Sequence, residues 1–274
     1  MHLRFVIGIL VLGQMLAAQV SLAQEPNYST IEQMFADAVS APCNDADRMA
    51  EVVEVFKRAG AAATDIHIDE YKDVKNVVVK VSGTAPGFIV IGAHFDKVEA
   101  GCGALDNWTG VTILAHLYKT VRQLEPARTL LFVGLGREEA GLLGSKAMVR
   151  AIPKNERKSY CGMINLDSFG LARPQFLLNV STNSLVKFTR ELAKKLNIPT
   201  AEARVDVADA DSSSFANNGI PAITLHGLSA EWIEIIHSPN DRAERIIKES
   251  VYDGYILALH LLGQMDSGAC DQFR

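Results

Sequence analysis

Several motifs that mark common enzyme and binding classes are missing from this chain of 274 residues. It has no G-x-S-x-G sequence, which carries the nucleophilic serine of many hydrolases, and no H-E-x-x-H sequence, which carries two zinc ligands on one helix. It also has no C-x-x-C pair. These absences argue against a serine hydrolase of that type, a helix-borne zinc protease site and a zinc site built from thiolates.

Long basic runs are absent as well. The formal net charge is −5, and no cluster of Lys and Arg occurs, so we expect no nucleic-acid partner. Internal repeats and low-complexity segments are also lacking. With 48% hydrophobic and 22% charged residues, the composition is that of an ordinary globular protein, which excludes collagen-like, coiled-coil and disordered chains.

A long apolar run occurs once, at the N-terminus. His2 and Arg4 precede an apolar run over residues 5–12, which continues more weakly to a small-x-small site ending at Ala23. This pattern predicts a signal peptide over residues 1–23. A transmembrane anchor is the alternative, but a glycine and two glutamines interrupt residues 13–19. We therefore expect residues 24–274 to be periplasmic or secreted, with no membrane attachment after signal cleavage.

The chain has four cysteines, and an even number in an exported protein suggests two disulfides. Cys43 and Cys270 lie near the two ends of the predicted mature chain, and the ends of a domain are often close together. We therefore expect the pairs Cys43–Cys270 and Cys102–Cys161. Four unpaired cysteines in the core are the alternative, because a domain of this size does not need crosslinks.

Strand and helix patterns alternate through most of the chain. We expect helices over 109–121, 142–151, 185–196 and 246–262, two more between 31 and 60, and strands within 65–81 and over 88–92, 129–135, 161–166, 176–180 and 222–225. This alternation predicts an α/β fold with a largely parallel sheet that is covered by helices on both faces. Ligands of such sheets bind beyond the carboxyl ends of the strands.

Acidic residues and histidines gather where the expected strands end. The strands are followed by His94 and Asp96, by Glu138 and Glu139, and by Asp167, while Asp106 and His237 lie in two loops rich in polar residues. Several carboxylates in one cleft repel one another, and divalent cations relieve that repulsion. Two imidazoles and three carboxylates would suit two metal ions, and nitrogen and oxygen ligands without thiolate favour zinc or another first-row ion.

Five of these stretches resemble the M28 family of zinc-dependent exopeptidases, in the order that the family has. They are residues 92–96, 103–110, 138–145, 165–167 and 237–241. The resemblance implies a single exopeptidase domain over residues 24–274, folded as a three-layer α/β sandwich with a mixed, mostly parallel sheet. It also implies two Zn²⁺ ions and a cis peptide bond after Asp106.

The resemblance assigns a role to each residue. Asp106 would bridge the two ions, with His94 and Asp167 on one and Glu139 and His237 on the other. Glu138 would be the general acid/base, and Asp96 would orient His94. The residue types suit these roles. His94 and Asp96 are two apart, so they point the same way on an extended chain, and Asp96 can accept the imidazole N–H.

The chain departs from the family at one segment. Ser212 stands where relatives usually have the histidine of a Ser-Asp-His sequence. Some relatives have a tyrosine a few residues earlier that assists the carbonyl oxygen, but this chain has Val205, Asp206 and Val207 there. The sequence therefore does not identify the residue that donates to the carbonyl oxygen of the substrate. Trp232 could line the substrate pocket, although we expect it in the core.

Together these features predict a secreted zinc aminopeptidase, a monomer that removes N-terminal residues from peptides. Alternatives on the same scaffold are a carboxypeptidase, for which Arg137 or Arg173 could hold the substrate carboxylate, a glutaminyl-cyclase-like enzyme and a non-catalytic ectodomain. Four histidines lie outside the polar clusters and are expected to be structural or exposed: His67, His116, His226 and His260.

Overall fold

The computed structural model describes residues 27–205 and 209–274, so the predicted signal segment, residues 1–23, lies outside the described part of the chain. The helices are α1 (Ile31–Ala38), α2 (Asp45–Arg58), α3 (Thr109–Val121), α4 (Leu143–Ala151), α5 (Asn183–Lys195), α6 (Asp211–Ala216) and α7 (Lys248–Ser267). The strands are β1 (Ile66–Glu70), β2 (Lys75–Val81), β3 (Phe88–His94), β4 (Thr129–Leu135), β5 (Tyr160–Leu166), β6 (Gln175–Leu177), β7 (Ala201–Ala203) and β8 (Ala222–His226).

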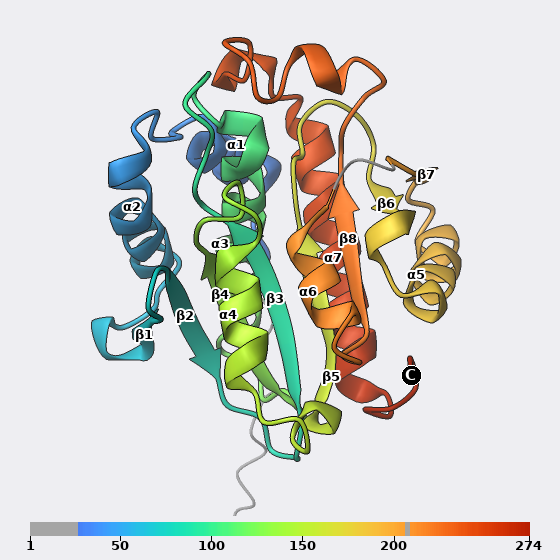
Figure 1. Ribbon diagram of the computed structural model, residues 1–274. Coiled ribbons are helices and arrows are strands. Elements are labelled where there is room, and N and C mark those ends of the chain that lie inside the picture. The colour runs from blue at the N-terminus through green and yellow to red at the C-terminus, as the bar shows by residue number, and fades with distance from the viewer. Residues whose placement is uncertain (1–26, 206–208) are drawn as a thin grey trace, which may run out of the picture.

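The strands of the described residues form one mixed sheet in the order β1-β2-β4-β3-β5-β8-β6-β7. Its centre, β4-β3-β5-β8, is parallel, whereas β2 joins β4 and β6 joins β8 in antiparallel fashion. The central strands are short apolar runs with almost every residue buried, as expected where helices cover both faces. Strand β8 points upward in Figure 1, so the carboxyl ends of all four central strands meet at the upper edge.

Helices cover both faces of the sheet, which confirms the predicted three-layer α/β sandwich. Helices α4 and α6 lie in front of the sheet in Figure 1 and pack on it through Met148, Val149 and Phe215. The opposite face carries α1, α2, α3, α5 and α7, whose apolar side chains form the larger core together with the sheet. In the described residues, no helix has enough consecutive apolar residues to cross a bilayer.

The structure differs from the predicted elements in a few places. Strand β6 ends at Leu177, and residues 178–180, which we expected to continue it, form a 3₁₀ turn. The three-residue strand β7 and the six-residue helix α6 were not predicted, because neither is long enough to show a periodic pattern. The last helix begins at Lys248 and extends to Ser267, five residues beyond the expected end.

All four cysteines form disulfides, but the predicted pairing is wrong. The pairs are Cys43–Cys102 and Cys161–Cys270. Cys102 lies in the loop after β3, at the carboxyl edge of the sheet, whereas Cys161 lies in β5 near its start, at the opposite edge. Helix α7 carries Cys270 to the edge where β5 starts. The two cysteines near the chain ends therefore lie at opposite edges of the sheet.

Candidate metal centre

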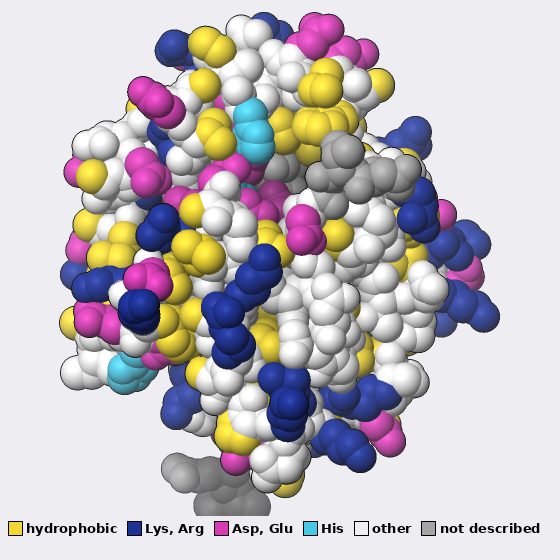
Figure 2. Space-filling model, in the orientation of Figure 1, with side chains coloured by type: hydrophobic (Ala, Val, Ile, Leu, Met, Phe, Trp, Pro, Cys, Tyr) yellow, Lys and Arg dark blue, Asp and Glu magenta, His cyan; other side chains and the backbone are white. Residues whose placement is uncertain are grey.

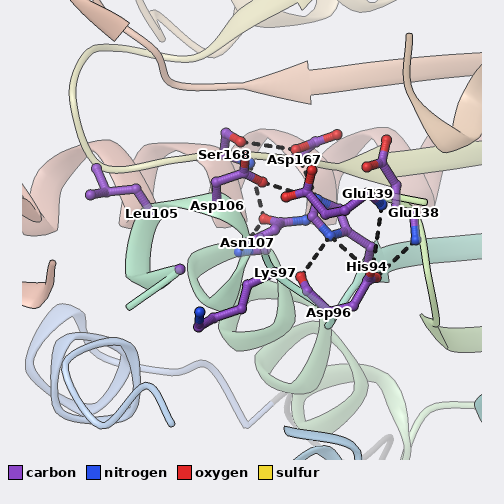
Figure 3. A network of polar contacts seen from close by, with 12 residues as sticks. His94, Asp96, Lys97, Leu105, Asp106, Asn107, Glu138, Glu139, Asp167 and Ser168 are labelled. Atoms are coloured by element: carbon purple, nitrogen blue, oxygen red, sulfur yellow. Dashed lines mark hydrogen bonds and ion pairs between the residues drawn. The ribbon is translucent and has the colours of Figure 1, made fainter. Parts of the chain in front are cut away.

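The predicted metal ligands converge at the carboxyl edge of the central strands. His94 is the last residue of β3, Glu138 and Glu139 follow β4, and Asp167 directly follows β5. Because these strands are neighbours, their ends bring the side chains together. Figure 3 shows the acidic side chains around the His94 ring, and Figure 2 shows acidic side chains gathered in a hollow of the upper surface.

Asp106 lies between the two histidines and presents one carboxylate oxygen to each. Its Oδ1 is 3.1 Å from His94 Nε2, and its Oδ2 is 3.0 Å from His237 Nε2. Each histidine also faces a second carboxylate: His94 Nε2 is 3.5 Å from Asp167 Oδ1, and His237 Nε2 is 3.1 Å from Glu139 Oε2. The structure thus brings all five predicted ligands together as two sets that share Asp106.

The segment that carries Asp106 is held from the other side by Asp241. This buried carboxylate accepts hydrogen bonds from the backbone N–H groups of Leu105 (2.7 Å) and Asp106 (3.2 Å). The peptide bond between Asp106 and Asn107 is cis, as the family resemblance implied. Asn107 is buried and donates from its side chain to the carbonyl oxygen of Leu166, which ties this segment to β5.

Asp96 contacts both His94 and the backbone of the two glutamates. Its carboxylate accepts hydrogen bonds from the backbone N–H groups of Glu138 (2.9 Å) and Glu139 (3.2 Å). The carbonyl oxygen of Asp96 is 3.2 Å from His94 Nδ1, whereas its carboxylate is 3.8 Å away. Asp96 thus fixes the backbone of the two glutamates, and its main chain, rather than its carboxylate, is the nearer partner of the imidazole.

Electrostatics at the predicted metal centre reflect its crowded carboxylates. Burial alone would raise the pKa of Asp106, but hydrogen bonds with His237 and His94 lower it well below the ordinary value. Hydrogen bonds with Asp106 and Glu139 raise the pKa of His237 to about 10. Burial opposes protonation of His94, yet the surrounding carboxylates raise its pKa well above the usual range. These shifts reflect a strongly negative cluster that positive charge stabilises.

The donor set fits divalent metal ions. It contains imidazole nitrogens and carboxylate oxygens and no thiolate, which suits zinc. Ligand atoms of His94, Asp106 and Glu139 all lie within 4.8 Å of one another. Glu139 Oε1 is buried without a hydrogen-bond partner among the described residues, as expected for an oxygen that faces a cation.

Two acidic residues beside these ligands depart from ordinary carboxyl behaviour. Burial and neighbouring carboxylates, Asp211 among them, raise the pKa of Glu138 to about 10. Asp211 is completely buried, and neither of its oxygens has a hydrogen-bond partner among the described residues. Burial raises its pKa to about 7. The sequence offered no signal for Asp211 beyond its place in the segment that departs from the family pattern.

A cavity of about 660 Å³ opens onto the centre. Its floor carries the ligands together with Glu138, and its walls include Leu177, Leu228 and Trp232. Trp232 therefore contacts the cavity as well as the core. His226, which we expected to be structural or exposed, also lines the cavity. Neither Arg137 nor Arg173 lines the cavity, and both are exposed.

A model of the family described as Peptidase family M28 matches residues 76–261, which is more than half of the chain. The chain belongs to peptidase family M28. Leucine aminopeptidase 1 of Trichophyton equinum is 35% identical over 176 residues, a match that covers 54% of this chain and 46% of that relative. The chain spans less than half the length of the curated relatives that it matches.

Solved structures share the fold. A zinc aminopeptidase from Bacillus subtilis has a TM-score of 0.63 at 21% identity, over 73% of this chain and 52% of that one. A glutaminyl cyclase from an Acidobacteriales bacterium has a TM-score of 0.73 at 15% identity, over 90% of this chain and 99% of that one.

In this M28 member, the segment around Ser212, which departs from the family pattern, is built into the core. The hydroxyl of Ser212 donates to the carbonyl oxygen of Val180 (2.9 Å) and lies 2.7 Å from Thr224 Oγ1. Val205 lines the cavity, while residues 206–208 lie outside the described part of the chain.

Proposed function

We propose that this protein is a secreted zinc aminopeptidase that removes N-terminal residues from peptides. The observation that carries the proposal is the position of Asp106, with one oxygen 3.1 Å from His94 and the other 3.0 Å from His237. A carboxylate shared by two histidine-carboxylate sets can hold two divalent ions side by side, as in two-metal hydrolytic sites. We further expect the protein to be a monomer.

The residues that would hold the ions divide into two sets. His94 and Asp167 would bind one zinc, Glu139 and His237 would bind the other, and Asp106 would bind both. Zinc bound there would polarise the scissile carbonyl group, lower the pKa of a water molecule and stabilise the carboxylate form of Glu138.

Glu138 is the proposed general acid/base. A carboxylate oxygen of Glu138 accepts a proton from the attacking water and then delivers it to the nitrogen of the leaving amine. Two features support this role. Glu138 lines the cavity beside the ligands, and its backbone is fixed by the hydrogen bond to Asp96. Its neighbour Glu139 faces His237, so the two adjacent glutamates have different tasks.

The charge of the cavity favours a substrate amine over a substrate carboxylate. Besides the proposed zinc ligands its lining includes the acidic residues Glu138 and Asp209, whereas the arginines that a carboxypeptidase would use are outside it. Lys146 is the one lysine or arginine among the described lining residues, and it is exposed, with its Nζ bonded to the carbonyl oxygen of Gly141 (3.0 Å). A protonated α-amine is therefore the better match for this cavity.

Export is supported by the two disulfides, which form and persist in oxidising compartments. The N-terminal pattern of the sequence points the same way.

The experiment is the Glu138→Gln substitution, with turnover of a peptide and zinc content measured on the same sample. We expect turnover to fall by about 10²–10⁴-fold, because the variant cannot accept the proton, while two zinc ions per chain remain bound. Glu70→Gln is the matched control, since Glu70 is exposed and pairs with Lys75 away from the cavity. Activity of Glu138→Gln close to that of the unaltered protein would refute the assignment.

A further inference from the structure

One polar group in the cavity has no role in the proposed chemistry. His226, the last residue of β8, is only 6% exposed and lines the cavity. Its Nδ1 accepts a hydrogen bond from the backbone N–H of Leu228 (3.3 Å), so Nε2 carries the proton and is a donor. Nε2 is buried without a partner among the described residues. Such an unmatched donor is costly and needs an explanation.

The register of the sheet places His226 beside the metal centre but not in it. Leu225 is the strand partner of Leu166, so the next residues, His226 and Asp167, follow at the same level on neighbouring strands. Neighbouring strands are about 4.8 Å apart. His94 ends β3, on the other side of β5. His226 therefore lies one strand beyond the metal ligand Asp167, on the side away from His94.

That part of the cavity suits the side chain of the N-terminal residue. If the scissile carbonyl group lies at the metal ligands, a substrate side chain directed toward β8 and β6 enters this part of the cavity. Gln175 on β6 is the strand partner of His226 and also lines the cavity. The surrounding walls are apolar and include Leu177, Leu228 and Trp232. Gln175, Thr224 and Ser229 also line the cavity, but among these lining side chains only His226 has a buried donor without a partner in the described residues.

The imidazole is neutral under ordinary conditions. Its Nδ1 accepts the hydrogen bond from the backbone N–H of Leu228, so that nitrogen carries no proton and the ring has no charge. A neutral donor cannot balance the charge of a carboxylate, and Asp209, which lines the same cavity, repels one. The matching group on a substrate is therefore an uncharged acceptor, such as a carboxamide.

We propose that His226 is a specificity-determining residue that selects peptides whose N-terminal side chain bears an uncharged hydrogen-bond acceptor. This inference rests on the proposed aminopeptidase function. A substrate carboxamide oxygen would accept the hydrogen bond from Nε2, whereas an apolar side chain of the same shape would leave the buried donor unmatched. Sites built around a buried donor discriminate strongly against analogues that lack the acceptor.

The test compares peptides that differ only in their first residue, as near-isosteric pairs: Gln against Met, and Asn against Leu. For the zinc-loaded protein we expect kcat/KM to favour the carboxamide member of each pair by about tenfold or more. His226→Phe should abolish this preference or reverse it. His226→Gln, which keeps a hydrogen-bond donor, should retain part of the preference. This second variant keeps the test valid if His226→Phe fails to fold. His260→Phe is the control, because His260 is exposed on α7.

The outcomes separate the two proposals. If none of the four peptides is hydrolysed, the aminopeptidase function fails. If all are hydrolysed but Met and Leu are removed as fast as Gln and Asn, the function stands and the role of His226 is refuted. A carboxamide preference that persists unchanged in His226→Phe also refutes the role of His226. The Asn–Leu pair keeps the result independent of any cyclisation of N-terminal Gln.

Discussion

Arg48 provides a sharp test of how the metal centre is supported, because its buried guanidinium holds the loop that joins two of the ligands. The side chain is completely buried and donates hydrogen bonds to four backbone carbonyl oxygens: Phe95, Pro42 (2.9 Å), Cys102 (3.1 Å) and Gly103 (3.1 Å). Burial lowers its pKa to about 10, and nearby carboxylates oppose that shift, so it stays charged at pH 7.

The perturbation is Arg48→Met, which keeps much of the side-chain volume and removes every donor. A buried acceptor without a partner costs about 1–3 kcal/mol, so four carbonyl groups at the lower limit give about 4 kcal/mol. The contact of the guanidinium with Trp108, whose ring centroid is 5.2 Å away, is lost as well. Because most domains have only about 5–15 kcal/mol of stability, this is a large fraction of the total.

The assay is urea unfolding, with the melting temperature as a second measure. We expect a loss of about 4 kcal/mol and, at about 2–4 °C per kcal/mol for a chain of this size, a melting temperature lower by about 8–16 °C. Zinc affinity should fall at least tenfold, since residues 95–103 connect His94 to the Asp106 segment. Arg58→Met is the control, because Arg58 is on the same helix but makes only exposed ion pairs, for which about 1 kcal/mol or less is expected. A loss of under 1 kcal/mol for Arg48→Met would show that the reasoning is wrong.

Three further predictions concern the metal, the packing and the crosslinks. Chelation should lower the melting temperature by several degrees in a thermal scan, because a ligand at about 1,000 times its dissociation constant stabilises the folded state by about 4 kcal/mol. An unchanged melting temperature would count against metal binding. Gly110→Ala should destabilise the protein and weaken zinc binding, since a Cβ there would overlap Asn107 Oδ1. Gly263→Ala, in an open position of α7, should instead stabilise the protein by up to about 1 kcal/mol in urea unfolding. Replacing both Cys161 and Cys270 with serine should cost about 2–5 kcal/mol, and non-reducing peptide mapping should recover that pair from the unaltered protein.

The centre of the fold and three of the five proposed ligands were predictable from local sequence. Each central strand is a short apolar run, and His94, Glu139 and Asp167 end such a strand or follow it closely. Parallel neighbours bring those positions together without further information. Asp106 and His237 are in loops, so their place beside the strand ends depended on the family resemblance.

The supporting residues were not predictable, because their roles arise from packing. Arg48 is on a helix with many charged residues and looks like a surface arginine until the loop after β3 folds over it. His226 ends an apolar strand and looks like a core residue until the cavity beside it is known. The pairing of Cys161 with Cys270 likewise depends on which end of the sheet the last helix reaches.

The most direct test of the account is mass spectrometry of a peptide with free ends, incubated with zinc-loaded protein lacking residues 1–23. An N-acetylated copy of the peptide is the control. The account predicts a ladder shortened stepwise from the N-terminus, an intact acetylated peptide and two zinc ions per chain. Shortening from the C-terminus, loss of ammonia with the peptide chain intact, or an unchanged peptide in the presence of bound zinc would contradict it.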